Sequence, residues 1–127
     1  MSNDLFTQFV NGSFTAPDGT KTALAELPWN PHPQFPGVYL KNIPSGPDPL
    51  NCLLVRIDPE QKIGLHNHPH SLELHEVIAG DGVCLSAGRE IAYRPGSLAL
   101  LPAATDHEVR AGKHGLCLFA KFVTVSG

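Results

Sequence analysis

A chain of 127 residues is long enough for one ordinary domain and too short for two. A hydrophobic fraction of 42% is sufficient for a core, and with only 17% charged residues the composition excludes a disordered chain. The formal charge of -3 leaves no basic surface for a phosphate backbone, so we expect no nucleic-acid partner.

The first 37 residues differ from the rest of the chain. Residues 4–10 and 22–27 are the only segments that we expect to form helical turns, because twelve prolines and twelve glycines oppose long helices throughout. The segment LPWNPHPQFPG, residues 27–37, contains four prolines and cannot be a regular element. We therefore expect residues 1–37 to form an irregular N-terminal arm packed on a barrel of residues 38–127.

Two aromatic side chains of this arm, Trp29 and Phe35, are suited to anchor it on the barrel. A functional alternative stays open from the residues alone, in which Trp29 or His32 helps to close the mouth of a pocket.

From residue 38 onward, the segments between turn residues are short and rich in Val, Ile, Leu, Phe and Tyr, which is typical of β-strands. The turns between them contain Gly, Pro, Asp and Ser, residues suited to a positive or a fixed φ. Many short strands at this spacing predict an all-β sandwich or barrel. The expected strands are residues 38–43, 50–57, 62–68, 73–79, 82–86, 89–94, 97–102, 107–111 and 115–125.

The sequence also bears on the location of the protein. The N-terminus MSNDLFTQFV has neither a basic segment nor a long apolar run, and no apolar run approaches the roughly 20 residues of a membrane span. The cysteines, Cys52, Cys84 and Cys117, are widely separated and lie in apolar runs, which indicates free, buried thiols. We expect a cytoplasmic protein with no membrane partner.

The stretch IGLHNHPHSLELHEVIAG, residues 63–80, contains four of the seven histidines. Because side chains alternate along a strand, His66 and His68 share a face, and their ring nitrogens can converge on one ion at about 2.0–2.1 Å. Pro69 interrupts regular pairing, which predicts a turn before the next strand begins at Glu73. A carboxylate from that strand would suit a divalent metal with mixed nitrogen and oxygen ligands.

The same alternation sorts the following strand. Glu73 and His75 share one face, and Glu76 lies on the other. His75 is then one layer further along, so we expect it beside the pocket or hydrogen-bonded to a metal ligand rather than on the metal. We expect His70, in the turn, to be exposed to solvent.

These residues resemble the first of the two motifs of the cupin superfamily, G-x5-H-x-H-x(3,4)-E-x6-G. The chain has His66 and His68, then four residues, Glu73, six residues and Gly80. Glu60 stands at the position of the leading glycine.

The second motif of that superfamily, G-x5-P-x-G-x2-H-x3-N, is similar to residues 96–111. Gly96, Pro102 and His107 match in register, while Ala104 and Ala111 replace the second Gly and the Asn. The differences fall at turn or terminal positions, and no metal-ligand position is lost.

The resemblance implies a double-stranded β-helix, a jelly-roll barrel like that of small, single-domain, RmlC-like cupins. It also implies one divalent metal ion held inside the barrel by His66, His68, Glu73 and His107. Such ligands suit Fe(II), Mn(II), Ni(II) or Zn(II), and leave one or two positions of an octahedral ion open. The alternative is a cupin in which these residues only form hydrogen bonds in an empty pocket.

Two functions fit this resemblance, since the family that the chain resembles includes both kinds of protein. In the first, the protein acts on a small molecule, with dioxygenase, isomerase or lyase chemistry, and His75 is the catalytic candidate. In the second, it is a non-catalytic module that binds or senses a small ligand through the metal.

Three further side chains are weaker candidates. Arg56 would meet a substrate carboxylate if the even-numbered face of residues 50–57 pointed inward, although an arginine reaching solvent is the favoured interpretation. Tyr39 and Tyr93 are expected in the core rather than in pocket walls.

Residues 115–125 are apolar on both faces apart from Lys121 and Thr124. One face belongs to the barrel core, and the other must be covered by the N-terminal arm or by a second subunit. We expect a homodimer.

Overall fold

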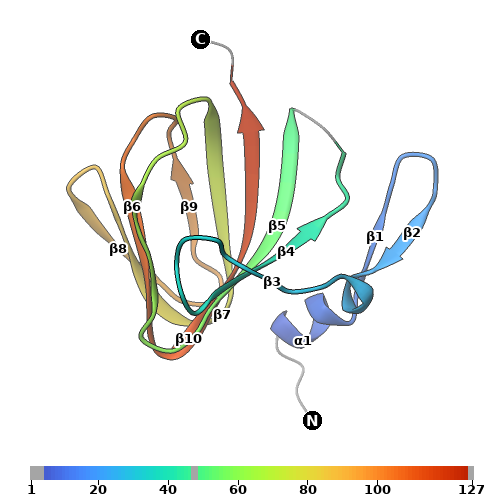
Figure 1. Cartoon of the computed structure of the whole chain (residues 1–127), viewed down its shortest axis with the longest axis horizontal. Coiled ribbons are helices and arrows are strands. Elements are labelled where there is room, and N and C mark those ends of the chain that lie inside the picture. The colour runs from blue at the N-terminus through green and yellow to red at the C-terminus, as the bar shows by residue number, and fades with distance from the viewer. Residues whose placement is uncertain (1–4, 47–48, 126–127) are drawn as a thin grey trace.

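The computed structural model describes residues 5–46 and 49–125, most of which lie in β-strands (Figure 1). The expected all-β class is confirmed. One short helix lies near the N-terminus, and among the described residues no helix is long and apolar enough to cross a membrane. The elements are α1 (Leu5–Val10), β1 (Ser13–Thr15), β2 (Lys21–Ala23), the 3₁₀ turn η1 (Leu24–Glu26), β3 (Asn30–Pro31), β4 (Val38–Ile43), β5 (Leu50–Ile57), β6 (Lys62–His66), β7 (Ser71–Ser86), β8 (Arg89–Tyr93), β9 (Leu98–Leu101) and β10 (His107–Thr124).

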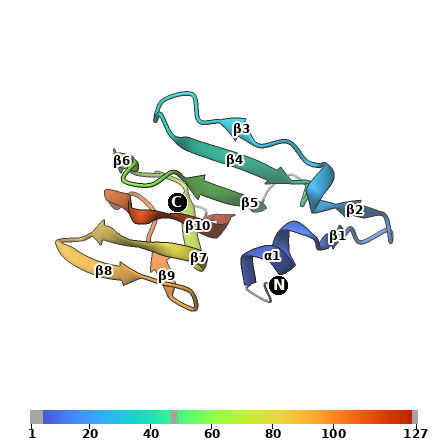
Figure 2. The same cartoon turned by 90° about the horizontal axis from the view of Figure 1, so that it is seen from below.

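Strands β3 to β10 belong to one antiparallel sheet, in the order β3-β4-β5-β10-β7-β8, while β6 pairs with β10 and β9 pairs with β7. The two long strands, β7 and β10, pair with each other along most of their length. The sheet curls over itself, so that its strands enclose a common interior (Figures 1 and 2). This is the jelly-roll barrel that the sequence motifs predicted.

Two of the expected turns are bends inside continuous strands. Strand β7 continues through Gly80 and β10 through Gly115, with φ values of 80° and 76°. A Cβ atom on Gly80 would lie 2.0 Å from the carbonyl oxygen of Gly115, so the strands can approach this closely only at glycine. The prediction of separate strands on either side of these glycines is therefore wrong.

The barrel interior is filled by apolar side chains from both layers of the sheet. Leu118, Val109 and Leu54 are all fully buried. Leu118 and Val109 belong to the cluster of apolar side chains in the barrel interior, whereas Leu54 belongs to a second cluster outside it. On β5, Val55 joins the interior cluster, so the odd-numbered face of that strand points inward. The conditional placement of Arg56 in the pocket is consequently wrong.

Residues of the N-terminal segment pack against the outer face of the sheet, beside β5, β7 and β10. Phe9 contacts Phe119 with ring centroids 5.4 Å apart, and Trp29 joins the same outer cluster. The buried ammonium of Lys41 donates a hydrogen bond of 2.7 Å to the carbonyl of Leu24. These contacts attach the segment to the barrel.

Local structure in this segment differs in part from the expectation. The helical turn predicted at residues 4–10 is present as α1, whereas residues 22–27 contain the end of β2 followed by η1. The short strands β1, β2 and β3 were not expected. Two or three residues are too few for a periodic pattern, so only their pairing reveals them.

Candidate metal centre

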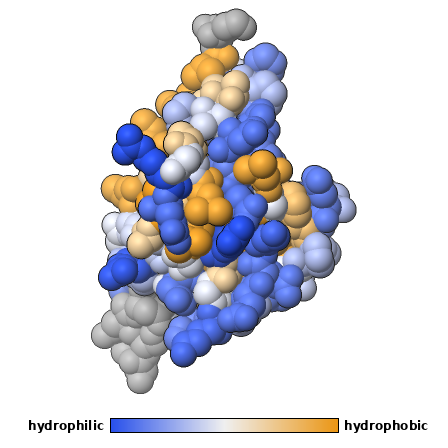
Figure 3. Space-filling model, turned by 90° about the vertical axis from the view of Figure 1, so that its left-hand side faces the viewer, coloured by the Kyte–Doolittle hydropathy of each residue, from blue (hydrophilic) through white to orange (hydrophobic). Residues whose placement is uncertain are grey.

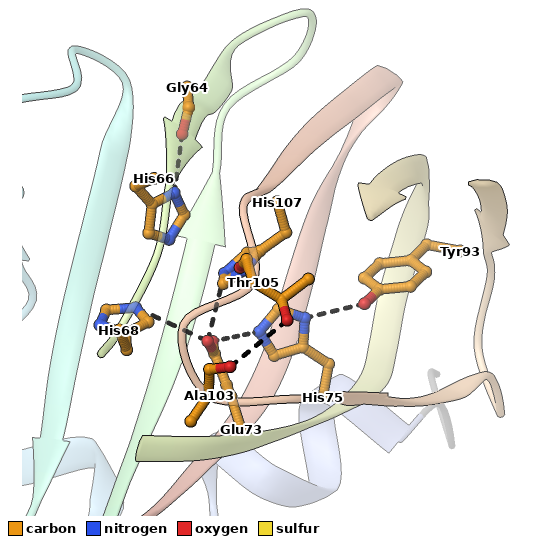
Figure 4. A network of polar contacts seen from close by, with 9 residues as sticks. All are labelled: Gly64, His66, His68, Glu73, His75, Tyr93, Ala103, Thr105 and His107. Carbon is orange, nitrogen blue, oxygen red and sulfur yellow. Dashed lines mark hydrogen bonds and ion pairs between the residues drawn. The ribbon is translucent and has the colours of Figure 1, made fainter. Parts of the chain in front are cut away.

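Four of the candidate site residues come from three neighbouring segments of the barrel (Figure 4). His66 is the last residue of β6, Glu73 lies on β7, and His107 is the first residue of β10. The register of β6 and β10 places His66 directly opposite His107. Sheet pairing thus brings together residues that are 41 positions apart in the sequence.

His68 is placed differently from the sequence expectation. Strand β6 ends at His66, so the alternation of strand side chains does not reach His68. Instead, the backbone N–H of Ala104 donates a hydrogen bond of 3.0 Å to the carbonyl of His68. This bond ties the turn after β6 to the loop before β10 and sets His68 beside His107.

The three histidines form a compact group. Ligand atoms of His66, His68 and His107 all lie within 4.8 Å of one another. The carboxylate of Glu73 contacts two of the three, with Oε1 3.2 Å from Nε2 of His107 and 3.6 Å from Nε2 of His68. Three imidazoles therefore form one compact group, and the carboxylate of Glu73 lies against two of them, His68 and His107.

Backbone carbonyls orient two of these rings. Nδ1 of His66 lies 2.7 Å from the carbonyl oxygen of Gly64, and Nδ1 of His107 lies 3.1 Å from that of Thr105. A carbonyl only accepts, so in the neutral form of each ring Nδ1 carries the proton and Nε2 has the free lone pair. This is the tautomer that metal ligation through Nε2 requires.

The centre contains two buried polar atoms without a hydrogen-bond partner, Oε1 of Glu73 and Nε2 of His107. They lie 3.2 Å apart, but their geometry is not that of a hydrogen bond. Leaving such atoms unpaired in the interior costs roughly 1–3 kcal/mol each. When His107 is neutral, both atoms present lone pairs toward the same space, so a divalent cation fits the donors that are present.

His75 lies directly behind Glu73 and does not join the histidine group. Its Nε2 is 2.5 Å from Oε2 of Glu73, and its Nδ1 is 2.8 Å from the hydroxyl of Tyr93. Both ring nitrogens of this buried side chain are thus engaged within the barrel. The contacts hold the carboxylate of Glu73 with one oxygen toward His75 and the other toward His107 and His68.

The local electrostatics suit a cation. Burial lowers the pKa of His66 and of His68 below the ordinary value, so both imidazoles are neutral at neutral pH. Burial acts to raise the pKa of Glu73, but the contacts with His107 and His75 outweigh it and lower that pKa to about 2. Burial acts to lower the pKa of His107, and the neighbouring Glu73 carboxylate outweighs it and raises that pKa.

A cavity of about 180 Å³ lies beside this group. Its wall includes the apolar side chains of β4, β5, β6 and β10 as well as His66, His68, Glu73 and His75. His32 from the N-terminal segment also lines it, whereas Trp29 instead lies beneath the cations of Lys41 and Arg56. Trp29 and His32 were the two candidates for closing the mouth of the pocket, and His32 is the one that lines the cavity.

The other candidates lie away from the cavity. The guanidinium of Arg56 stacks between the rings of Trp29 and Tyr39, at 4.9 and 4.4 Å from their centroids. Tyr93 is a core residue whose hydroxyl reaches His75. His70 is exposed, as expected, and the outward Glu76 pairs with Lys121.

At two positions where the chain departs from the cupin motifs, the backbone still has the positive φ that is typical of glycine. Glu60 and Ala104 have φ values of 65° and 58°, in the left-handed region that glycine occupies most readily. The turns of the motifs are therefore retained despite the substitutions, and one of them makes the hydrogen bond from Ala104 to His68.

Phe35 was expected only to anchor the N-terminal arm, and its place beside His66 was not predicted from the sequence. Its ring lies 6.2 Å from that of His66, and a Cβ atom on Gly64 would come within 3.0 Å of it. The only signal in the sequence was a glycine within a strand, which marks a close approach by another group.

Comparison with known proteins agrees with this geometry. The sequence model of the family described as "Cupin domain" matches residues 53–120, more than half of the chain. No curated protein matches the chain.

Several solved structures share the fold. A predicted oxalate decarboxylase from Thermotoga maritima has a TM-score of 0.72 and 16% identity, over 80% of this chain and 96% of that one. KdgF from Halomonas sp. has a TM-score of 0.70 and 22% identity, over 80% and 90%. An RmlC-like cupin from Shewanella frigidimarina has a TM-score of 0.70 and 17% identity, over 80% and 86%. At these identities the similarity is one of fold. Together with the family match, it shows that the chain belongs to the cupin domain family.

Proposed function

We propose that this cupin holds one divalent metal ion through His66, His68, Glu73 and His107 and uses it to bind a small molecule in the adjacent cavity. The observation that carries the proposal is the pair of buried, unpaired atoms, Oε1 of Glu73 and Nε2 of His107. A pocket whose residues served only as hydrogen-bonding groups would leave both atoms unsatisfied at a cost in stability.

Each surrounding residue then has a defined task. A divalent ion bound there supplies a Lewis acid that polarises an oxygen of the bound molecule. His75 orients Glu73, and the hydroxyl of Tyr93 holds the ring of His75 in place. His75 is therefore assigned as a positioning residue, since its two ring nitrogens are already engaged.

Metal content tests the proposal most directly. We expect His66→Ala and His107→Ala to lower bound metal well below one ion per chain, because each removes a ligand. His70→Ala is the matched control and should leave the content unchanged, since His70 is exposed in the turn. The measurement is elemental analysis of protein purified without a histidine tag. Unchanged metal in both ligand variants would refute the site.

The same preparation separates an enzyme from a sensor. Fe(II)-loaded protein that consumes O₂ with a small organic substrate would be a dioxygenase, and conversion without O₂ would indicate isomerase or lyase chemistry. Tight binding of a small molecule without turnover under any metal would favour the non-catalytic module.

A homodimer remains part of the proposal, now with a defined surface. The arm covers Cys117 and Phe119 on the outer face of the sheet, but apolar residues further along this face stay exposed. Figure 3 shows hydrophobic atoms at the surface on the side of Figure 1 where β6, β8 and β9 lie. The exposed outer-face residues are Leu98 at 66%, Leu100 at 61%, Leu50 at 40% and Val123 at 38%.

The strand register makes these residues neighbours on one continuous outer face. Leu100 of β9 pairs with Leu74 of β7. Val123 of β10 pairs with Leu72 of β7 on one side and with Leu50 of β5 on the other. A second copy that covers this face would remove it from water. We expect sedimentation at micromolar concentration to give a dimer and Leu100→Glu to give a monomer. A monomeric wild-type protein would contradict the dimer.

A further inference from the structure

The cavity beside the metal centre has one polar group that the metal proposal does not use, His32. It comes from the turn between β3 and β4, and it lines the cavity together with the residues of the centre. Its ring lies 4.9 Å from that of Phe35, which in turn lies 6.2 Å from that of His66. The turn thus forms part of the wall next to the histidine group.

Backbone groups determine the tautomer of His32. The N–H groups of Gln34 and Phe35 both donate to its Nδ1, at 3.0 and 3.2 Å. An atom that accepts two hydrogen bonds carries no proton, so the proton of the neutral ring is on Nε2. In the described part of the chain Nε2 has no hydrogen-bond partner, which leaves it as a donor for a ligand.

The turn that carries His32 is held rigidly. The N–H of His32 donates to the carbonyl of Val38 at 2.8 Å, and Asp58 donates to the carbonyl of Gly37 at 2.8 Å. Phe35 fits against Gly64, where a Cβ atom would come within 3.0 Å of its ring. A donor on such a turn can select a ligand without a large cost in ordering the protein.

Burial supports the neutral form, because it lowers the pKa of His32 below the ordinary value. Protonation would also remove the lone pair that the two backbone N–H groups use. His32 therefore acts as an uncharged donor at neutral pH, and it does not attract anions as a cation would.

The rest of the cavity limits the ligand. Among the described residues that line it there is no Lys or Arg, and the walls are Leu40, Leu53, Val55, Ile63, Val109, Leu118 and Phe122. A cavity of about 150 Å³ accommodates one benzene ring, so the 180 Å³ found here suits a ring with small substituents. A six-coordinate ion held by the four proposed ligands would leave two positions open, which would suit two neighbouring oxygens of such a ligand.

Given the proposed metal site, on which this inference rests, we propose that His32 is a specificity-determining residue. Its Nε2–H donates to an acceptor at the far end of a ring-sized ligand whose two adjacent oxygens bind the metal. The ligand class is a compact, largely apolar molecule with a chelating oxygen pair and a distal acceptor. Small dianions without an apolar body are disfavoured.

The test compares two probes, 4-nitrocatechol and 4-ethylcatechol, which share the chelating oxygens and differ in whether the distal substituent accepts a hydrogen bond. Binding to Co(II)-loaded protein is measured anaerobically by calorimetry, in the wild type and in His32→Asn. Asparagine can accept from the backbone N–H two residues on, as in an Asx-turn, so the variant keeps the turn and loses only the distal donor.

We expect His32→Asn to weaken 4-nitrocatechol binding about fivefold, the value of one net hydrogen bond, and to change 4-ethylcatechol binding less than about twofold. Oxalate, a dianion without an apolar body, should bind the wild type more weakly than 4-nitrocatechol. Equal effects of the variant on the two catechols, or tighter binding of oxalate, would overturn the inference.

Cobalt content measured on the same samples separates the two proposals. Wild-type protein that takes up no metal refutes the metal site, and the inference about His32 is refuted with it. Wild-type protein with one ion per chain and no probe discrimination in the variant refutes the role of His32 alone. Loss of metal from His32→Asn would show that His32 supports the ion itself, which also contradicts the proposed role.

Discussion

The charge of Glu73 has a consequence for the pH dependence of stability in the metal-free protein. The pKa of its carboxyl falls from 4.5 to about 2 in the folded state, and only 6% of the side chain is exposed. Since each pKa unit corresponds to about 1.4 kcal/mol, ionised Glu73 contributes on the order of 3 kcal/mol to the free energy of unfolding.

The sign follows from the direction of the shift. As pH falls below about 5, the unfolded chain takes up a proton on this carboxyl while the folded chain does not, so stability decreases. The contribution is fully present above the unfolded pKa and is lost as pH approaches about 2, with a slope of up to about 1.4 kcal/mol per pH unit.

Glu73→Gln removes the titrating group and keeps nearly the same shape. We expect urea unfolding of chelator-treated wild type to lose on the order of 1 kcal/mol more than the variant between about pH 5 and pH 3.5. Other carboxyl groups are common to both proteins and cancel in this difference. Parallel stability curves for the two proteins would refute the account of how His107 and His75 stabilise the charge.

Three further predictions concern the barrel around the centre. Leu118→Ala should lower the free energy of unfolding by about 2–5 kcal/mol because Leu118 is fully buried, whereas Leu65→Ala, at 65% exposure and outside the proposed dimer face, should cost less than about 0.5 kcal/mol; equal urea midpoints would contradict this. Tyr93→Phe should weaken metal affinity up to about tenfold through the lost contact with His75, without removing the site, and unchanged affinity in a metal competition assay would argue against the positioning role. Ala104→Gly should raise the melting temperature, because removing the steric strain of a left-handed alanine stabilises the folded protein by about 1 kcal/mol. A lower melting temperature would mean that the methyl group of Ala104 contributes to packing.

The barrel could be predicted from the sequence because strand patterns and motif spacings are local properties. Glu73 and His75 were correctly expected to be buried on one face of a strand, with Glu76 outside. The motif match at His107 then indicated which distant segment approaches them. The metal-ligand assignment itself stays a prediction until metal content is measured.

The bends at Gly80 and Gly115 could not be distinguished from turns. A glycine with positive φ serves equally in a tight turn and in a bulge, and the outcome depends on which strand lies alongside. Likewise, the inward face of β5 was ambiguous, because apolar residues stand on both faces, Cys52 and Leu54 on one and Val55 and Ile57 on the other. The arm resolved that ambiguity, since its aromatic residues cover the face that carries Leu54 and Arg56.

The sequence by itself determined the all-β class, the cupin motifs and the order of side chains along each strand, because these follow from local conformation and spacing. Only the tertiary structure decided that a backbone hydrogen bond rather than strand alternation places His68, and that His75 lies behind Glu73 with both nitrogens engaged. It also decided that His32 reaches the cavity. These features depend on hydrogen bonds and packing between segments far apart in the chain, which no local pattern contains.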